Sequence, residues 1–241
     1  LAAKKGVTVL VEFVDPEYIY VGLDISAEYN YTITTKSSGQ IYDLLVAAVE
    51  NYFTTDLQKF DADYKHSLMI SQLIDVDEAV TSVLASITLQ KRIIPVLNAT
   101  NVLNLTNAIE FRNSIKPGSF KSSYYNMTLN GTQTLVRIID IPNDNPANEL
   151  GQGTLRLINA NDSSVINSNI GIINYATGTV SIDSIVPVSL PSGAEDIRFT
   201  CNIQERSYNL NTNKNEIFVL DDSVLNRITG TEEGLTITVS S

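Results

Sequence analysis

Residues 18–34, YIYVGLDISAEYNYTIT, alternate apolar and polar side chains almost without interruption. Alternation with a period of two is typical of a β-strand that buries one of its faces. At about 3.3 Å per residue this strand would extend about 50 Å, beyond the usual length of a strand. The side chains expected on the buried face are Ile19, Val21, Leu23, Ile25, Ala27, Tyr29, Tyr31 and Ile33. Backed by helices, such a strand forms a stiff strut.

Two further strands and two helices are predicted around the long strand. The apolar run VTVLVEF predicts a strand over 7–13, and renewed alternation predicts another over 79–92. Ser37 and Gln40 have the spacing of a capping box, and an apolar stripe follows them, which predicts a helix over 39–57. KHSLMISQLID predicts a shorter helix over 65–75. Residues 1–96 are therefore expected to form an α+β domain, a sheet covered by two helices.

The rest of the chain is expected to be rich in β-structure. Pro95 and the Asn-rich stretch after it mark a change of domain. Asn130-Gly131 and Thr177-Gly178 are turn signals between strand-like runs, so each predicts a hairpin. The fold class predicted is α+β, with an N-terminal sheet covered by two helices, a β-rich domain at 97–206 and a β-containing C-terminal extension at 207–241. That extension is expected to contain the short strands EIFVL and LTITV and to need a surface to lie against.

Charge and cysteine content exclude several classes of function. With 16 Lys and Arg against 27 Asp and Glu, the net charge is −11, which argues against nucleic-acid or anionic-membrane partners. No apolar run reaches the length of a membrane-spanning helix. Cys201 is the only cysteine, so we expect a buried thiol and neither an intrachain disulfide nor a thiolate metal cluster. The opening LAAKKG has no Met and no signal pattern, and we interpret it as the cut end of a longer chain.

The chemistry-bearing residues do not form a recognised catalytic motif. His66 is the only histidine, Ser67 follows it directly, and no G-x-S-x-G elbow is present, so a polar helix histidine is the favoured interpretation. Gly151-Gln152-Gly153 lacks the third glycine of a nucleotide-binding loop and is interpreted as a turn. We predict no catalytic, cofactor-binding or metal-binding residues and no cofactor. The carboxylate groups weighed for acid–base chemistry or Ca²⁺ are Asp61/Asp63, Asp75/Asp77/Glu78, Asp221/Asp222 and Glu232/Glu233.

Tyrosines cluster in two strand-like segments and leave two interpretations open. Tyrosine suits a protein interface, because it buries a large area and keeps a polar group. It also suits cross-strand packing inside the molecule. The residues concerned are Tyr18, Tyr20, Tyr29, Tyr31, Tyr124 and Tyr125, and no Lys or Arg alternates with them as base stacking would require.

Five motifs occur in one order along the chain and carry a family resemblance. They are VEFVDPEYIYV at 11–21, SLMISQLIDVDEAVTSV at 67–83, LQKRIIPVLN at 89–98, IKPGSFKSS at 115–123 and GIINYATGTVSID at 171–183. Together they resemble the C-terminal part of the baseplate wedge protein of T4-like contractile-tailed phages, within the broader baseplate J-like group. The loop at 142–153 and the segment 207–241 match this family least.

The resemblance implies a structural, non-enzymatic subunit of the virion's tail baseplate, assembled in the host cytoplasm. Two copies would pair as a homodimer, contact neighbouring wedge proteins and join a ring around the tail hub. A part of the family protein N-terminal to this chain would supply some of those contacts.

Two alternatives come from other classes of protein. An Asn- and Thr-rich β-module with surface tyrosines and acidic loops is typical of carbohydrate-binding or adhesin proteins, and it predicts affinity for a glycan or Ca²⁺. A glycosidase would need two carboxylates about 5–9.5 Å apart in a pocket, and the sequence gives no sign of that convergence.

Overall fold

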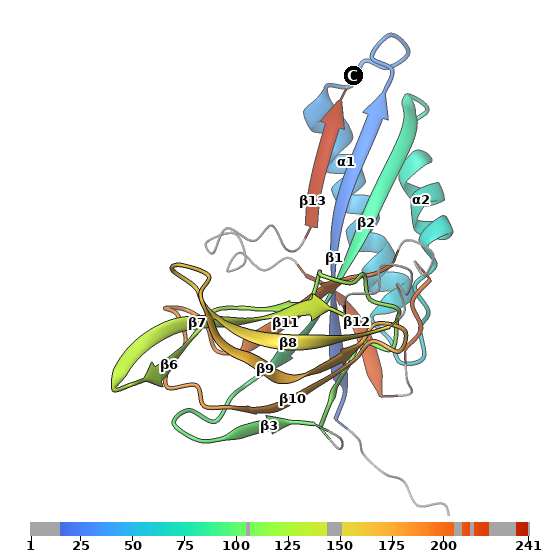
Figure 1. Cartoon of the computed structure of the whole chain (residues 1–241). Helices are drawn as coiled ribbons and strands as arrows, with labels where there is room; N and C mark the ends of the chain where they lie inside the picture. Colours follow the sequence, from blue (N-terminus) through green and yellow to red (C-terminus); the bar gives the residue numbers. More distant parts are fainter. Residues whose placement is uncertain are drawn as a thin grey trace, which may run out of the picture.

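The computed structural model describes residues 15–104, 107–143, 151–204, 209–212, 215–221 and 235–240. Within these residues, thirteen strands join one sheet and two α-helices lie on part of it (Figure 1). In chain order the elements are β1 (Glu17–Tyr29), α1 (Ser38–Tyr52), a π-helical turn η1 (Phe53–Leu57), α2 (His66–Ile74), β2 (Val80–Ile93), β3 (Asn101–Leu103), β4 (Ile109–Glu110), β5 (Lys121–Ser122), β6 (Tyr125–Leu129), β7 (Thr132–Pro142), β8 (Gln152–Asn159), β9 (Val165–Asn174), β10 (Thr179–Ile185), β11 (Ile197–Asn202), β12 (Glu216–Leu220) and β13 (Leu235–Ser240).

The predicted α+β class is wrong, because the chain is mostly β. The main path through the sheet is β12-β1-β2-β11-β5-β7-β8-β9-β10-β3, and β13, β4 and β6 branch from it. A sheet confined to the first 96 residues and covered by two helices is therefore not what forms. β11 pairs with β2 from Ile197↔Ile93 to Asn202↔Thr88, which joins a late strand directly to an early one. Periodicity predicts individual strands but not pairings between residues so far apart in sequence.

The long strand β1 is paired on both of its edges. β2 lies antiparallel to it from Tyr20↔Gln90 to Tyr29↔Val80. On the other edge β12 pairs in parallel with Glu17–Val21, and β13 continues in parallel with Leu23–Glu28. The two short strands of the C-terminal segment therefore lie end to end against β1. This strand is the surface that the segment was predicted to need.

The upper part of the molecule is an arm made of β13, β1 and β2, with α1 and α2 on its rear face in Figure 1. The buried face of β1 is the predicted one, with Ile19, Val21, Leu23, Ile25 and Ala27 at most 1% exposed. α1 has Ser37 as its N-cap and both bonds of the capping box, as the sequence predicts. Of the expected stripe, the residues that α1 fully buries are Ile41, Leu45, Val49 and Tyr52.

Two element ends differ from the prediction. β1 ends at Tyr29 rather than at residue 34, because the Asn30 side chain accepts bonds from the backbone N–H and the hydroxyl of Thr32, at 2.9 and 2.6 Å. This turn competes with further strand pairing. The last predicted turns of the first helix form η1, where the Thr54 and Thr55 hydroxyls donate to backbone carbonyls at Glu50 and Asn51.

The strands from β3 to β11 form a body that crosses the lower end of β1 and β2 (Figure 1). The predicted hairpin turn at Asn130-Gly131 is confirmed: both residues have positive φ, 51° and 80°, and they join β6 to β7. Thr177-Gly178 likewise joins β9 to β10. The predicted strand 7–13 and most of the 142–153 loop lie outside the described residues. The division of the chain at residue 96 stays a prediction.

Candidate functional site

His66 lies at the first position of α2, where its contacts hold the helix in place. Its Nδ1 is 3.1 Å from the Tyr64 hydroxyl, and its backbone N–H donates to Asn209 Oδ1 at 3.2 Å. Burial lowers the pKa of His66 from its ordinary value. The backbone N–H therefore fastens the start of α2 to the chain at residue 209, while the ring contacts Tyr64 and its lowered pKa favours the neutral form.

Among the described residues, the acidic groups that the sequence singled out do not line either cavity of the molecule. Asp77 accepts from Ala79 N–H at 2.9 Å and pairs with Lys36, and these contacts lower its pKa, the hydrogen bond from Lys36 most strongly. Asp61 and Asp63 are exposed. Within the described part of the chain, no group of three or more His, Cys, Asp or Glu side chains is arranged to hold a metal ion. Asp222, Glu232 and Glu233 lie outside the described residues.

The Gly151-Gln152-Gly153 segment is not a turn throughout, because β8 begins at Gln152. A Cβ at Gly153 would lie 2.1 Å from the Tyr175 hydroxyl and 2.9 Å from the carbonyl oxygen of Ile141. Gly153 is therefore required for close packing inside the sheet, and the G-x-G spacing has no connection with phosphate binding.

Tyr175 belongs to a buried polar cluster centred on Asp140 of β7. The Asp140 carboxyl accepts from Gly118 N–H at 2.7 Å, Phe120 N–H at 2.9 Å and the Tyr175 hydroxyl at 2.7 Å. Burial raises the pKa of Asp140 although these three bonds favour the ionised form. The cluster holds the 118–120 loop against β7.

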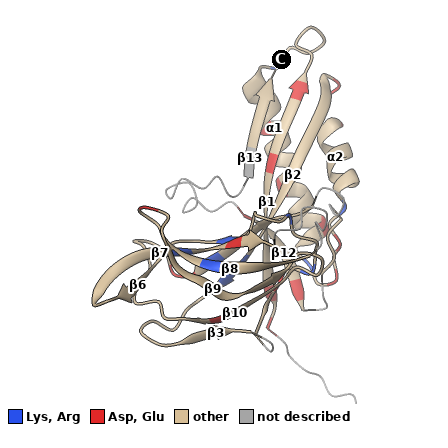
Figure 2. Ribbon diagram, in the orientation of Figure 1, with Lys and Arg blue, Asp and Glu red and all other residues tan. Residues whose placement is uncertain are grey.

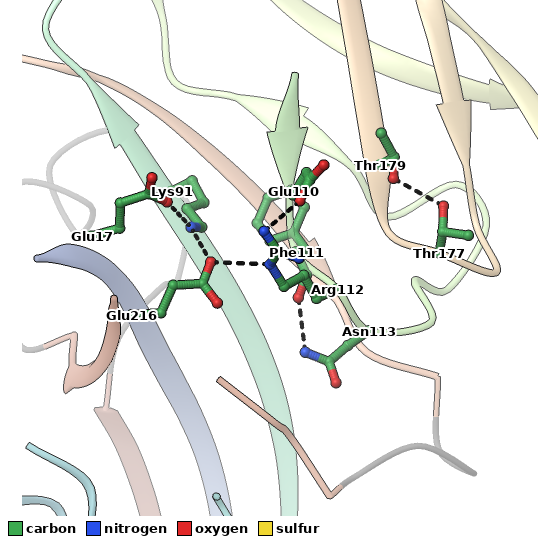
Figure 3. Close-up of polar contacts among 9 residues, drawn as sticks. All are labelled: Glu17, Lys91, Glu110, Phe111, Arg112, Asn113, Thr177, Thr179 and Glu216. Atoms are coloured by element: carbon green, nitrogen blue, oxygen red, sulfur yellow. Dashed lines mark hydrogen bonds and ion pairs between the residues drawn. The ribbon is translucent and has the colours of Figure 1, made fainter. Parts of the chain in front are cut away.

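A cavity of about 620 Å³ opens where the arm meets the body. Side chains of both signs surround it, and Figure 3 shows how they pair. Glu216 of β12 is 1% exposed in its side chain and lies 3.0 Å from Lys91 Nζ and 3.4 Å from Arg112 Nε. Lys91 also pairs with Glu17 at 3.4 Å, and Arg112 pairs with Glu110 at 2.6 Å. These ion pairs connect β1, β2 and β12 to the segment around residue 112.

The neighbouring Arg92 is held from three sides. Its guanidinium lies 3.4 Å from the centre of the Tyr20 ring, and its terminal nitrogen is 2.7 Å from Asp221 Oδ1. The buried Asp221 also accepts from Gln90 at 3.0 Å, and Gln90 accepts from Arg92 Nε at 2.6 Å. The sequence shows Lys91-Arg92 as a basic pair, but its partners Glu216 and Asp221 lie more than a hundred residues away, where no local pattern links them.

Large apolar side chains lie exposed beside this charged cavity. Tyr18 and Ile94, which line it, are 46% and 81% exposed, and Val96 shortly after Ile94 is 65% exposed. We call Tyr18, Tyr20, Arg92, Ile94 and Val96 the junction surface. Tyrosine and arginine next to exposed aliphatic groups are typical of protein-contact sites. The charged groups around the cavity are paired with one another, so the arrangement suits contact with a partner rather than acid–base chemistry.

The other tyrosines divide between the two interpretations. Tyr125 is fully buried, and Tyr29 packs against the core, as cross-strand packing requires. Tyr31 is 67% exposed because β1 ends before it. Tyr124 contacts Arg137, whose guanidinium donates to its hydroxyl at 3.2 Å. Among these tyrosines, Tyr18, Tyr31 and Tyr20, whose ring lies against Arg92, remain candidates for contact with another protein.

Comparison with known families gives a match to part of the chain. Residues 17–92 match the family described as baseplate structural protein gp6, C-terminal domain III. The matched segment runs from β1 through α1 and α2 to β2, less than a third of the 241 residues. No curated protein matches the chain at a significant level. The match supports a structural role in a phage baseplate and a location in the virion tail. Neither α-helix of the described chain has the length and apolar character needed to cross a membrane.

Proposed function

We propose that this chain is a non-enzymatic subunit of a contractile phage tail baseplate wedge. It pairs with a second copy and with neighbouring wedge proteins, and the paired copies join a ring around the tail hub after assembly in the host cytoplasm. The observation that supports this most is the match of residues 17–92 to a baseplate structural domain. The matched residues include the whole of β1 and nearly all of β2, the two strands that run from the arm into the body.

The mechanical properties of the arm fit such a role. β1 is bonded to β2 on one edge and to β12 and β13 on the other, so its hydrogen-bonding groups are engaged along most of its length. α1 and α2 cover the apolar face of these strands. A sheet paired and covered in this way resists bending, and a stiff element transmits force between the proteins bound at its ends.

We place the self-pairing contact at the junction surface. The cavity there is lined by three cations, Lys91, Arg92 and Arg112, and three anions, Glu17, Glu110 and Asp196. Two copies related by a two-fold axis bring the same patch together. Because its charges are balanced and paired within each copy, the two patches do not repel each other. The exposed Ile94 and Val96 supply apolar area for the centre of such a contact.

Light scattering over a concentration series tests this proposal. We expect the mass to rise to that of a dimer, and Ile94→Lys to weaken dimerisation at least about tenfold, because a charge then replaces a buried apolar contact. Val165→Lys, at a 52% exposed position on β9 away from the junction surface, is the matched control and should dimerise as the parent chain does. A strict monomer at the highest concentration contradicts self-pairing by this chain. A dimer unaffected by Ile94→Lys contradicts the surface assigned.

A further inference from the structure

β2 has one edge that is only half used within the described residues. β11 pairs with it from Ile93 to Thr88, and the Ile203 N–H donates to the carbonyl of Ile87 at 3.2 Å. Between Val80 and Ser86 no described strand pairs with this edge, while β1 occupies the opposite one. The open segment lies in the arm, on the side of β2 that faces away from β1 (Figure 1).

The backbone groups available at this edge follow from the register. In an antiparallel strand the N–H and C=O of alternate residues point to the same side. Because the carbonyl of Ile87 points toward β11, those of Ala85 and Val83 point the same way, into the unpaired part. Two residues thus present hydrogen-bonding groups to an incoming strand.

The edge lacks the features that normally prevent strand addition. Proteins protect open edges with charged side chains, proline or bulges. From Ser82 to Ser86 the unpaired sequence SVLAS contains no charge and no proline, and the one register shift between β1 and β2 lies at its start, between Val80 and Ser82. Leu84 on this stretch is 71% exposed.

A groove beside the edge has room for an added strand. It measures about 570 Å³ and is lined by His66 and Ile70 of α2 and by Val83, Leu84 and Ala85 of β2. α2 lies beside β2 on the open side in Figure 1, so it forms a floor on which inward-facing side chains of a further strand can rest. Leu68 on α2 is 43% exposed and adds apolar surface to that helix.

The face of β1 and β2 that points away from the helices is acidic, and this charge favours a basic partner segment. Asp24 and Glu28 of β1 are exposed on this face, opposite Ser86 and Ser82 of β2. From Gly22 to Tyr29 and from Val80 to Gln90 neither strand carries a Lys or Arg, and Figure 2 shows red without blue along this part of β1. Asp24 also lines the groove, and only the small Ser86 and Ser82 lie between these carboxylates and the open edge. A long Lys or Arg side chain on an added strand can therefore extend across β2 toward them.

We infer that the open edge of β2 binds an extended segment of a different protein chain by strand addition, with basic residues outward and apolar residues against α2. A second copy of this chain fits poorly, because it would bring two acidic faces and two copies of α2 together. The inference does not rest on the baseplate proposal, since it uses only the edge, the groove and the charges.

The test uses a capped, fluorescent peptide of about nine alternating Lys and Val residues, a common strand length. Binding to the intact chain is followed by anisotropy, and hydrogen exchange monitors the amides of Val83 and Ala85. We expect saturable binding that protects both amides. The same peptide with Glu in place of Lys should bind at least about tenfold more weakly, because it repels Asp24 and Glu28.

Two controls separate strand addition from simple charge attraction. Ala85→Pro removes an N–H on the open edge, where proline is tolerated, and should weaken binding at least about tenfold. A Lys–Val peptide N-methylated on the amides of one edge keeps its charge and should lose binding to the unchanged protein, which decides the matter even if Ala85→Pro does not fold. Equal binding of the N-methylated peptide, or of the Glu peptide, overturns the inference. Loss of a dimer in an Ala85→Pro protein that still folds also overturns it, because the edge would then belong to a second copy.

Discussion

Asp140 is a buried carboxyl that accepts three hydrogen bonds, and its removal should destabilise the fold. Asp140→Ala leaves two backbone N–H groups, of Gly118 and Phe120, and the Tyr175 hydroxyl without their acceptor. We expect a loss of about 3 kcal/mol in the free energy of unfolding, measured by urea denaturation, because buried donors without partners are costly. Asp183→Ala, at an exposed position on β10, is the control and should change stability by less than about 0.5 kcal/mol.

The same pair of proteins gives the pH dependence of this cluster. Burial raises the pKa of Asp140, so the folded state holds its proton to a higher pH than the unfolded state does. The stability that Asp140 contributes is then fully present below its unfolded pKa, and it falls as pH rises through the folded pKa. The stability difference between the parent chain and Asp140→Ala should therefore be larger at about pH 3.5 than at about pH 7. A difference that grows with rising pH would mean that the three hydrogen bonds outweigh burial.

The sequence contained no sign of this cluster or of the Glu216 and Asp221 ion pairs. Asp140 follows an ordinary strand pattern, and its three partners come from a loop and from the turn after β9. Gly153 was misinterpreted for the same reason: its close approach to Tyr175 exists only after β8 and β9 have paired. Residues whose role depends on contacts distant in sequence leave no local pattern to detect.

Helix α1, in contrast, is specified by neighbouring residues. Its capping box and apolar stripe follow from side chains within a few positions of one another, and the structure confirms both. The Asn130-Gly131 hairpin was predicted for the same reason, since turn chemistry is local. The long strand was predicted on its correct face, but its end was not, because Asn30 forms a side-chain turn that the alternation conceals.

The cap of α1 therefore offers a direct test of local stabilisation. In the Ser37→Ala variant the Gln40 N–H loses its bond to the Ser37 hydroxyl. Unfolding free energy should fall by about 1 kcal/mol, the usual cost of losing an N-cap. Thr34→Ala removes a hydroxyl that accepts from Lys36 N–H outside the helix, at 3.2 Å, and is the matched control. Equal losses for the two variants would show that the cap has no special importance.

The joining of arm and body explains why the fold class could not be obtained from patterns. Local patterns predict a division near residue 96 into a helix-containing part and a β-rich part, and the α+β prediction followed from treating these two parts separately. The structure unites them through β2, which pairs with β1 on one edge and with β11 on the other. The Arg92–Asp221 and Lys91–Glu216 ion pairs also connect β2 to β12 and the residue after it through side chains.

A strand shared in this way should make the arm and the body unfold together. We expect one calorimetric transition, with equal van't Hoff and calorimetric enthalpies, because unfolding either part removes a neighbour of β2. Hydrogen exchange gives a sharper form of the same prediction. Asp140→Ala alters only the body, yet it should lower the opening free energy of the slowest α1 amides in the arm by the same amount as that of the slowest β8 amides. If the α1 amides keep their opening free energy while those of β8 lose it, the two parts unfold separately, and the boundary near residue 96 marks two domains despite their common sheet.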